Sequence, residues 1–364
     1  MTHEFKNVEK ILVIKLRHIG DVLLAVPVFR ALRENLPHTH IAALVNSGTE
    51  EVLTGNPLIN EIIVFDRSIK KLSLSRWLWE ESIFLRGIKN KHFDMTVDLT
   101  GGDRAAIISF ISGARYRLAY NPNKEGFLGK KYLYTHLAQK DGSQHMVLQN
   151  LDIVKQFGIN TDNLIVDIFI PEDAKIFVRR IFNENGINEK DTVVHVHPTS
   201  RWLFKCWKDE YMAEVISWLL SKGIRVIVTS SPDKREMEKA KRILSLCSSL
   251  VTRHSSLLID LCGRTTIKQL AAISESSDLF LGIDSAPMHI AAAVDTPVIA
   301  LFGPTGDSNW RPWYTGNSKD PHIVVRRNWA CGPCGGICED KISKCLYDIT
   351  PREIIDVLED VVFK

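Results

Sequence analysis

Polar side chains in the second half of the chain are of the types that bind a diphosphate. Thr199 and Ser200 offer hydroxyl groups, and Lys205 offers a compact positive charge in the same segment. Further on, Gly282-Ile-Asp-Ser-Ala286 stands between a short apolar run and an alanine-rich run, which predicts a strand, a turn and a helix. The first N–H groups of a helix have no partner within it and attract phosphate. The sequence therefore predicts a phosphate or nucleotide site in this half.

Three nearby residues allow more than one interpretation. The Asp284 carboxylate would repel a phosphate, so we expect it to cap the helix or to accept hydrogen bonds from neighbouring amides. Glu236 suits either a site beside a ribose hydroxyl or an exposed position on a helix. His289 lies one turn into the helix, and it is either a partner of Asp284 or of a phosphate, or a core residue.

The first half of the chain offers one carboxylate in a comparable position. Asp21 ends the segment Leu16-Arg-His-Ile-Gly-Asp21, which follows the apolar run Lys10–Lys15 and contains Arg17 and His18. This segment lacks the GxGxxG pattern of a dinucleotide-binding loop, so we do not expect the nucleotide in this half. Asp21 is either a functional carboxylate close to Arg17 and His18 or the N-cap of the next helix.

Four cysteines near the C-terminus are closely spaced. Cys331, Cys334, Cys338 and Cys345 are separated by two, three and six residues. This spacing suits either a thiolate site for zinc or an iron–sulfur cluster, or a loop packed by reduced cysteines. Structural zinc sites usually place two close pairs farther apart, so we favour the packed loop.

Composition indicates a globular protein with room for two domains. The chain has 364 residues, of which 45% are hydrophobic and 24% are charged, and no run approaches the roughly 20 apolar residues that span a bilayer. The first residues lack the pattern of a signal peptide, so we expect a cytosolic protein with reduced cysteines. The net charge of +3 is too small to indicate a nucleic-acid partner, and it lies in residues 1–170, which hold 21 Lys and Arg against 18 Asp and Glu.

Alternating apolar and amphipathic segments predict the elements that position these side chains. Strands are expected at 10–15, 40–45, 62–65, 95–99, 164–170, 192–197, 225–229, 257–262, 279–283, 296–301 and 322–326. Helices are expected at 22–36, 50–54, 77–90, 105–112, 211–222, 234–246, 267–274, 288–294 and 351–363, and one more begins near 171. Such alternation indicates parallel, doubly wound sheets of the α/β class, which bind ligands at the carboxyl ends of their strands. The segment between 160 and 191 reads as a boundary between two Rossmann-like halves.

A basic segment with aromatic residues runs from Arg67 to Lys91. It combines seven Lys and Arg with two tryptophans, a mixture that can lie on an anionic membrane surface. Glu80 and Glu81 in its middle favour the alternative, a solvated helix with one face toward the core. Both interpretations remain open at this point.

The segments that carry these residues resemble one enzyme family. Lys15-Leu-Arg-His-Ile-Gly-Asp-Val-Leu-Leu24 is similar to the opening of the ADP-heptose:lipopolysaccharide heptosyltransferases, the glycosyltransferase family 9 proteins. Gly282-Ile-Asp-Ser-Ala-Pro-Met-His289, Phe302-Gly-Pro-Thr305 and the block His197-Pro-Thr-Ser200 resemble that family's donor-binding segments. The matches span nearly the whole chain, and within the family they are most like the heptosyltransferase III type.

The resemblance implies the GT-B fold, in which two Rossmann-like domains with parallel sheets face each other. It implies an acceptor-binding domain at 1–170 and an ADP-sugar-binding domain at 171–364, with the last helix as a candidate to pack back on the first domain. It further implies ADP-heptose as the donor and the phosphorylated core of lipopolysaccharide as the acceptor, with no required cofactor and no nucleic acid. The enzyme is then expected in the cytoplasm, on the cytoplasmic face of the inner membrane.

The resemblance also assigns roles to single residues. The family's base falls on Asp21, its phosphate-binding hydroxyls fall on Thr199 and Ser200, and its lysine falls on Lys205, in a loop with one extra residue. The remaining donor-binding candidates are Glu236, Thr265 at the adenine position, Asp284, Ser285, Ala286 and His289. The acceptor-binding candidates are Arg17, His18, Arg115 and Arg117, the last two from the stretch Ser112–Arg117.

The resemblance implies inversion at the anomeric carbon, and these residues suit a transfer that needs no metal. Asp21 would take the proton of a sugar hydroxyl as it attacks the anomeric carbon, and Lys205 with the amides near Ser285 would stabilise the leaving diphosphate. The alternatives are a GT-B transferase with another sugar nucleotide and acceptor, a sugar-nucleotide epimerase of the same architecture, and a binding protein without catalysis. The product separates the first two, and a binding protein would not need Asp21.

Overall fold

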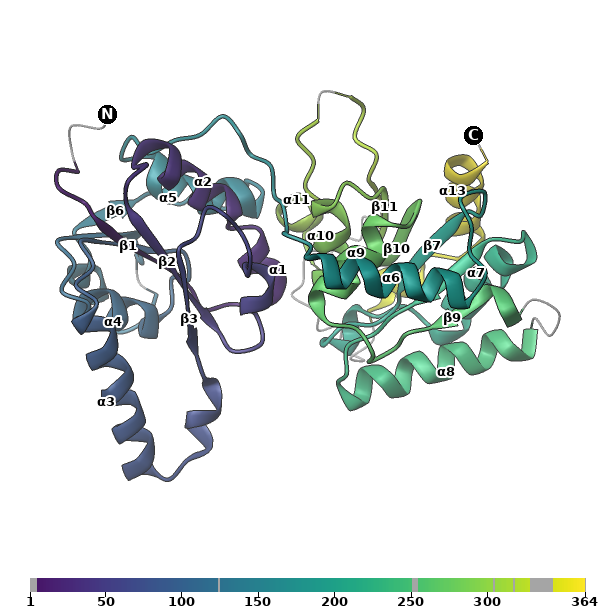
Figure 1. Ribbon diagram of the computed structural model, residues 1–364, viewed down its shortest axis with the longest axis horizontal. Coiled ribbons are helices and arrows are strands. Elements are labelled where there is room, and N and C mark those ends of the chain that lie inside the picture. The colour runs from purple at the N-terminus through teal and green to yellow at the C-terminus, as the bar shows by residue number, and fades with distance from the viewer. Residues whose placement is uncertain are drawn as a thin grey trace. The chain divides into compact units, whose positions relative to one another are not determined.

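Two α/β units make up the chain, one formed by Met1–Phe169 and the other by Ile170–Lys364. The computed structural model describes residues 5–123, 125–250, 255–303, 305–316, 318–327 and 343–363. Each unit contains one six-stranded sheet in which neighbouring strands run parallel (Figure 1). The predicted α/β class with two parallel sheets is therefore confirmed. No helix of the described ranges is both long enough and apolar enough to cross a membrane.

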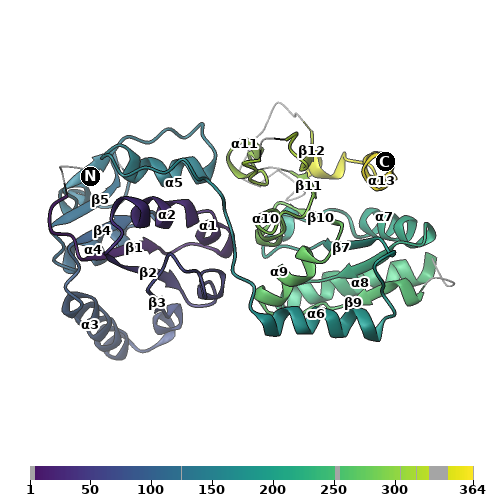
Figure 2. The same ribbon diagram turned by 45° about the horizontal axis from the view of Figure 1, so that its top comes forward.

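The first sheet has the strand order β3-β2-β1-β4-β5-β6. Its strands are β1 (Lys10–Lys15), β2 (His40–Asn46), β3 (Glu61–Phe65), β4 (Met95–Asp98), β5 (Tyr116–Tyr120) and β6 (His136–Ala138). Helices α2 (Val26–Asn35) and α5 (Met146–Lys155) cover one face, whereas α3 (Leu74–Asn90) and α4 (Asp103–Ile111) cover the other (Figures 1 and 2). β1 reads as an unbroken apolar run because both of its faces are buried.

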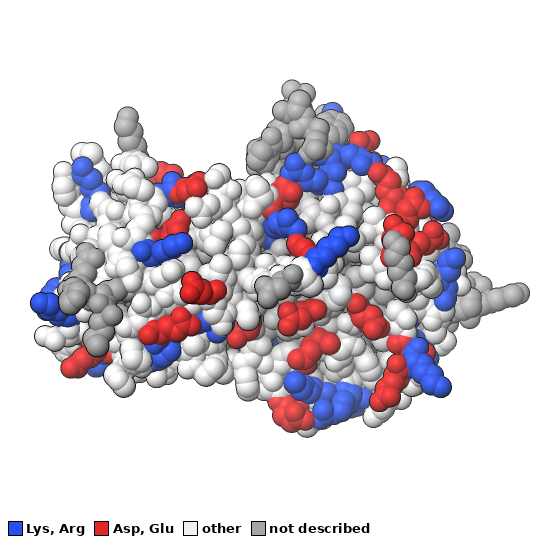
Figure 3. Space-filling view, turned by 90° about the horizontal axis from the view of Figure 1, so that it is seen from above, with Lys and Arg blue, Asp and Glu red and all other residues white. Residues whose placement is uncertain are grey.

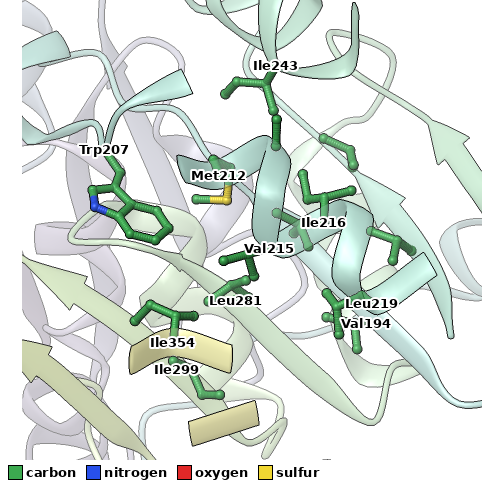
Figure 4. Packing of buried hydrophobic residues seen from close by; sticks show 14 of the residues in the cluster. Val194, Trp207, Met212, Val215, Ile216, Leu219, Ile243, Leu281, Ile299 and Ile354 are labelled. Atoms are coloured by element: carbon green, nitrogen blue, oxygen red, sulfur yellow. The ribbon is translucent and has the colours of Figure 1, made fainter. Parts of the chain in front are cut away.

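The second sheet has the strand order β12-β11-β10-β7-β8-β9. Its strands are β7 (Val193–His197), β8 (Arg225–Val228), β9 (Leu258–Asp260), β10 (Leu279–Ile283), β11 (Val298–Phe302) and β12 (Ile323–Arg326). The helices that pack on it are α6 (Glu172–Glu184), α7 (Asp209–Ser221), α8 (Lys234–Leu250), α9 (Ile267–Glu275), α10 (Ala286–Ala293) and α13 (Pro351–Val362). Side chains of β7 and β10 contribute to the core beneath α7, α8 and α13 (Figure 4).

Trp207 is the largest side chain buried in that core. Its ring packs edge-on against Tyr211 with the ring centroids 5.5 Å apart, and its indole N–H donates to the carbonyl oxygen of Ile349 at 3.0 Å. A buried indole needs such a partner, since an unpaired N–H in the core costs free energy. This hydrogen bond joins the segment before α7 to the segment before α13.

The first predicted helix is wrong in its bounds, because a break divides it. The structure has α1 (Ile19–Leu23) and α2, separated at Leu24 and Ala25. Pro27 stands in the first turn of α2 and has no N–H to continue the hydrogen bonding of α1. The carbonyl oxygen of Leu24 instead accepts from the Asn150 side-chain amide at 3.1 Å. Asp21 therefore lies on a short helix and not on the loop that the sequence suggested.

The strand predicted at 164–170 is also wrong, since this segment is irregular. The carbonyl oxygen of Ile165 accepts from the Arg30 guanidinium at 3.0 Å, so a side chain takes the place of a neighbouring strand. In the other direction, β5, β6 and α5 were not predicted. Tyr116–Tyr120 mixes polar and apolar residues because β5 is only half-buried at its start, and three-residue β6 is too short to show periodicity.

Helix α13 belongs to the core of the second unit. Ile354 and Leu358 are fully buried there, and the helix packs on α7. Its start is fixed by a capping box, in which the Thr350 hydroxyl accepts from the Glu353 N–H and the Glu353 carboxylate accepts from the Thr350 N–H. The sequence offered the first domain as a packing partner for the last helix. The apolar face of α13 instead packs within its own unit.

Glu353 makes a first prediction possible. Its carboxylate also receives two N–H···O contacts from Arg327 at 2.5 Å, and this hydrogen bonding lowers the pKa of Glu353 to about 2. Glu353→Gln should reduce the free energy of unfolding at pH 7 by about 0.5–1 kcal/mol, the range of a partly exposed ion pair. Because the folded-state pKa lies below the ordinary value, the contribution is present at neutral pH and is lost as the pH falls from about 4.5 toward 2.

Denaturant unfolding at several pH values measures this effect. Glu359→Gln on the same helix is the control and should leave the stability at pH 7 unchanged. If the difference in unfolding free energy between wild type and Glu353→Gln stayed constant from pH 7 to pH 3, the ion pair with Arg327 would not stabilise the fold.

Candidate active site

The carboxyl ends of four strands of the first sheet surround a cavity of about 310 Å³. Its lining comes from the segments that follow β1, β2, β3 and β4, namely Leu16, Arg17, His18, Asn46, Phe65, Arg67, Thr100, Gly102, Asp103, Arg104 and Ala105. Two predicted residues, Arg17 and His18, are among them. With three arginines and one aspartate in this lining, the cavity suits an anionic ligand.

Thr100 ties the two central segments of this cavity together. Its hydroxyl accepts from the Leu16 N–H at 2.8 Å and donates to the carbonyl oxygen of Ile14 at 3.1 Å. Its own carbonyl oxygen accepts from the Arg17 guanidinium at 2.8 Å, and the Asn46 amide donates to the carbonyl oxygen of Arg17 at 3.1 Å. The segment after β1 is therefore held from both neighbouring strands before any ligand binds.

Two buried charged side chains, Asp98 and Lys130, hold the segment after β4 in place. The Asp98 carboxylate accepts from the N–H groups of Thr100 and Gly101 at 2.7 and 3.1 Å and from the Tyr134 hydroxyl at 2.5 Å. Burial raises the pKa of Asp98 above its ordinary value, and these hydrogen bonds oppose the rise. The Lys130 ammonium donates to the carbonyl oxygen of Gly101 at 2.6 Å. Gly101 has φ +69°, a conformation that favours glycine at this turn.

Lys15 at the end of β1 is a further buried charged side chain at this edge. Its ammonium donates to the carbonyl oxygen of Leu99 at 2.9 Å and to the Asn150 side chain at 2.8 Å. Burial lowers the pKa of Lys15 to about 8, and the nearby negative charge of Asp21 opposes this shift. Lys15 therefore joins β1, the segment after β4 and α5 at one point.

Asp21 lies in the first turn of α1, whose N-cap residue is the cavity-lining His18. His18, not Asp21, holds the N-cap position, so the alternative role of Asp21 as N-cap is excluded. Within the described residues its carboxylate has no hydrogen-bond or ion-pair partner, and it is partly exposed. A carboxylate in that condition is able to accept a proton from a ligand hydroxyl group.

Two arginines of this cavity were not named as site residues from the sequence. Arg104 donates to both carboxylate oxygens of Glu81 at 2.9 Å, and its guanidinium stands 4.4 Å from the centre of the Phe65 ring. Arg67 is exposed at the start of the short 3₁₀ helix η2 (Arg67–Lys71). The basic segment after β3 was the signal for Arg67, and its two interpretations, a membrane-facing helix or a solvated one, did not include a site.

Arg115 and Arg117 do not lie with Asp21. They stand at the start of β5, where Arg117 pairs with Thr96, whereas the cavity lies where the parallel strands end. Arg117 donates to the carbonyl oxygens of Leu133 and Ala114, each at 2.6 Å, and the Arg115 guanidinium stands 4.5 Å from the Tyr116 ring centre. The acceptor role expected for these two arginines is thus not supported by their position, because they occupy the opposite edge of the sheet.

In the second unit, Thr199 and Glu236 form a buried pair after β7 and β8. The Thr199 hydroxyl donates to the Glu236 carboxylate at 2.9 Å, and the Ser231 hydroxyl donates to its other oxygen at 2.8 Å. Glu236 is only 4% exposed, so the interpretation as an exposed helical glutamate is wrong. Ser200 stands beside Thr199 and is also buried.

A second pair joins Lys205 to Asp284. The ammonium of Lys205, on the 3₁₀ turn η4 (Leu203–Lys205), lies 2.6 Å from the Asp284 carboxylate, which also accepts from the Thr305 hydroxyl. The expectation that Asp284 caps α10 is wrong, because Ser285 is the N-cap residue and Asp284 faces Lys205. The loops after β7, β10 and β11 meet at these three side chains.

The other predicted donor residues lie at the same edge. Ser285 precedes α10 and donates to the carbonyl oxygen of Ile283 at 3.2 Å, so its side chain does not cap the helix, which begins at Ala286. His289 is buried in α10, with its ring centre 6.5 Å from that of Trp310. Thr265 is partly exposed in the loop between β9 and α9. The structure thus brings all of these residues to the carboxyl edge of the second sheet.

Two buried histidines of β7 stiffen this edge. His195 and His197 each contact the Thr229 hydroxyl, at 2.7 and 2.8 Å, and His195 also contacts the Ser274 hydroxyl at 2.9 Å. Burial lowers the pKa of His197 to about 3 and that of His195 well below its ordinary value, so both are neutral at pH 7. Opposite His197 stands Gly282, where an added Cβ would lie 3.1 Å from the carbonyl oxygen of His197.

The cysteine segment lies largely outside the described residues. Cys331, Cys334 and Cys338 are not described, and Cys345 is buried in the helical turn α12 (Lys344–Tyr347). Across the described part of the chain, no three His, Cys, Asp or Glu side chains are grouped so as to hold a metal ion. The packed loop of reduced cysteines stays a prediction, because three of the four cysteines lie outside the described residues.

Two Rossmann-like units, each with polar side chains at the carboxyl edge of a parallel sheet, are the architecture of the GT-B class of glycosyltransferases. The family model of glycosyltransferase family 9 (heptosyltransferase) matches residues 83–335. The chain belongs to this family, and the resemblance found in the sequence is confirmed.

Curated relatives and solved structures agree with this placement. Lipopolysaccharide heptosyltransferase 3 of Escherichia coli strain K12 is 32% identical over 308 residues, which cover 82% of this chain and 83% of the relative. The structure of E. coli ADP-heptose lps heptosyltransferase II has a TM-score of 0.77 at 20% identity and covers 97% of this chain and 98% of its own. That of E. coli heptosyltransferase WaaC with ADP-2-deoxy-2-fluoro heptose has a TM-score of 0.71 at 17% identity, covering 96% and 99%.

The contacts of Lys15 generate a second prediction. Lys15→Met leaves two buried acceptors, the Leu99 carbonyl oxygen and the Asn150 side chain, without their donor, and should lower the free energy of unfolding at pH 7 by about 2 kcal/mol. Because the pKa of Lys15 is lowered from 10.5 to about 8, the unfolded chain binds the proton more readily between these values. The wild type should gain stability from this group as the pH rises from 8 to 10, and the variant should lack that gain.

Chemical unfolding at pH 7, 8.5 and 10 measures both effects. Lys10→Met, at the exposed start of the same strand, is the matched control and should change the stability by less than about 0.5 kcal/mol. Equal losses in both variants would mean that the buried hydrogen bonds of Lys15 are not the source of the effect.

Proposed function

We propose that this protein transfers L-glycero-D-manno-heptose from ADP-heptose to the inner core of lipopolysaccharide. One observation carries the proposal. The first unit holds a basic cavity and a carboxylate, Asp21, that has no partner among the described residues, and the second unit holds an edge with hydroxyl groups and a lysine. Membership of glycosyltransferase family 9 and the similarity to lipopolysaccharide heptosyltransferase 3 support this choice of donor and acceptor.

The second unit is the proposed donor site. Thr199, Ser200 and Lys205 would bind the diphosphate, together with the N–H groups at the start of α10 near Ser285 and Ala286. Glu236, already an acceptor for the hydroxyls of Thr199 and Ser231, is suited to accept from the ribose hydroxyls as well. The loop with Thr265 is proposed for the adenine, and His289 for the neighbourhood of the phosphates.

The first unit is the proposed acceptor site. Its cavity presents Arg17, Arg67 and Arg104, which can donate two parallel hydrogen bonds to a phosphate or a carboxylate. His18 lies beside them and at the N-cap of the helix that carries Asp21. The acceptor hydroxyl group would then lie near Asp21 while the charged groups of the core occupy the cavity.

The proposed reaction is a single displacement with inversion. The acceptor oxygen forms a bond to the anomeric carbon as the bond from that carbon to the diphosphate breaks, and ADP leaves with the electron pair. Asp21 takes the proton of the acceptor hydroxyl, while the Lys205 ammonium and the amides of α10 stabilise the charge on ADP. One base and no covalent nucleophile are enough for this outcome.

The proposed cellular location of the enzyme follows from its proposed acceptor. The lipopolysaccharide core is built on a lipid, so the enzyme would work at a membrane surface, and we propose the cytoplasmic face of the inner membrane. No nucleic acid is required as a partner.

The test is a transfer assay with purified protein, ADP-heptose and acceptors truncated at defined positions of the inner core. Formation of ADP together with a core longer by one heptose supports the proposal. Transfer of another sugar, or release of an altered free sugar without an acceptor, would assign the fold to a different transferase or to an epimerase.

Asp21→Asn gives a third prediction. The amide cannot take the proton, so transfer should fall by at least about a hundredfold, while ADP binding measured by calorimetry should stay within about twofold. Glu34→Gln, an exposed carboxylate on α2, is the control and should keep wild-type turnover. Turnover of Asp21→Asn within a few-fold of wild type would remove Asp21 from the role of base.

Metal removal gives a fourth prediction. Since a lysine and a helix terminus are proposed to neutralise the diphosphate, turnover and ADP binding should survive EDTA. Metal analysis of the purified protein, before and after chelation, serves as the control and tests the cysteine segment independently. Activity that disappears with EDTA and returns with magnesium or manganese would overturn the proposed stabilisation of the leaving group.

A further inference from the structure

Large apolar side chains are exposed on helix α3. Leu74, Leu78, Trp79 and Ile83 have exposed fractions of 70%, 52%, 62% and 47%. Trp79 and Ile83 lie on the side of α3 that faces away from the core, since Ile88 is buried in that core and Phe84 packs against it. Leu74 and Leu78 are exposed at the N-terminal end of the helix, on the same side as Ile88. Helix α3 therefore has apolar residues on both sides, and only one side has a partner within the described structure.

The apolar exposure continues onto the elements next to α3. Helix α4 packs on α3 and on the 3₁₀ helix η3 (Lys130–Leu133), so the three form one continuous side of the first unit. α4 exposes Ile107 and Phe110, and Phe127, Leu128 and Tyr132 are exposed within and just before η3. Nine of the sixteen large apolar side chains that are exposed in the described structure lie on this side. Single exposed apolar residues are ordinary, but a contiguous group marks an interaction surface.

The same part of the chain concentrates positive charge. Residues 67–91, which span η2 and α3, contain 7 Lys and Arg against 2 Asp and Glu, whereas the rest of the chain contains 39 against 41. Of the two glutamates on α3, Glu81 is neutralised by Arg104. By contrast, the face drawn in Figure 3 carries Lys and Arg interspersed with Asp and Glu. The side chains of Lys70 and Lys71, which belong to this basic segment, lie outside the described ones.

Arginines and lysines stand among the exposed apolar residues. On α3, Arg76, Arg86 and Lys89 are exposed, and the Lys131 ammonium stands 5.0 Å from the Tyr132 ring centre. Tryptophan and aliphatic side chains beside basic ones are the composition of helices that lie in a membrane interface. Lipid headgroups of negative charge attract the basic residues, and the interfacial region accepts the apolar ones. A protein partner would have to supply many acidic groups and apolar pockets at once.

This side of the unit also leads to the basic cavity. η2, which carries the lining residue Arg67, leads toward α3, and α4 begins at the lining residues Asp103 and Arg104. We propose that the exposed side of α3, α4 and η3 is a docking surface for an anionic lipid bilayer. The proposal rests on the proposed function in one respect, since a lipid-borne acceptor would reach the cavity from the docked membrane.

Vesicle sedimentation tests the docking surface with the full-length protein. The probes are vesicles of phosphatidylcholine alone and of phosphatidylcholine and phosphatidylglycerol in equal parts. Trp79→Ser/Ile83→Ser removes apolar contacts, and Arg86→Gln/Lys89→Gln removes charge; each pair should weaken binding to the mixed vesicles by about tenfold or more. Binding of the wild type should fall with added salt, and phosphatidylcholine vesicles should bind much less.

Ile176→Ser/Arg179→Gln on α6 of the second unit is the matched control. Ile176 is 54% exposed, comparable to Ile83, so its loss from a surface without a docking role should leave vesicle binding unchanged. Thermal unfolding of all variants should match that of the wild type, because the replaced side chains are exposed. Unchanged vesicle binding by both α3 variants would overturn the proposal.

Transfer assays separate this proposal from the proposed function. With a delipidated, soluble acceptor the α3 variants should keep wild-type turnover, whereas with acceptor in mixed vesicles they should lose it. A wild type that binds vesicles but transfers no heptose to either acceptor would refute the proposed function and leave the docking surface in place. A wild type that forms dimers, with α3 variants monomeric and no vesicle binding by either, would assign the surface to a second copy of the chain and overturn the proposal.

Discussion

The parallel alignment of the strands is the constraint on which both candidate sites depend. Since every strand of a sheet runs the same way, the segments after the strands all emerge at one edge, however far apart they are in sequence. In the first unit this brings Arg17, Arg67 and Arg104 together, and in the second it brings Lys205 to Asp284 across 79 residues. The chemistry at each edge is thus assembled from short segments whose own sequences show little of it.

Three polar pairs at the two edges are formed within the protein. Thr199 donates to Glu236, Lys205 pairs with Asp284, and Arg104 pairs with Glu81. A ligand that uses one of these groups must compete with, or share, its protein partner, so the net free energy of binding is smaller than the number of contacts suggests. Asp21 differs from them, since its carboxylate has no such partner within the described residues. The base role proposed for Asp21 would gain from this freedom, because no protein partner competes for the carboxylate.

The sequence predicted the central strands, the α/β class and the family, because buried parallel strands are unbroken apolar runs and the motifs at their ends are local. It also placed Asp21, Thr199, Lys205 and Asp284 at strand ends. It missed the pairing of Asp284 with Lys205, since no local pattern encodes a contact between loops. The break before Pro27 was missed because the apolar periodicity continues across it. Arg115 and Arg117 were named as acceptor-binding candidates although β5 was not predicted, and the start of β5 lies at the edge of the sheet opposite to the cavity.

The contact between Lys15 and Asn150 has a consequence for how the protein is made. Its two residues are 135 positions apart, and Asn150 also binds the carbonyl oxygen at the break after α1. During synthesis, β1 leaves the ribosome long before α5, so Lys15 and Leu24 remain hydrated until the last helix of the unit has emerged. The edge that carries Asp21 is therefore completed late, by a distant contact with a high loop-closure entropy. Nascent chains that end before α5 would contain the strands of this sheet but would lack the hydrogen bonds of Asn150 to Lys15 and Leu24.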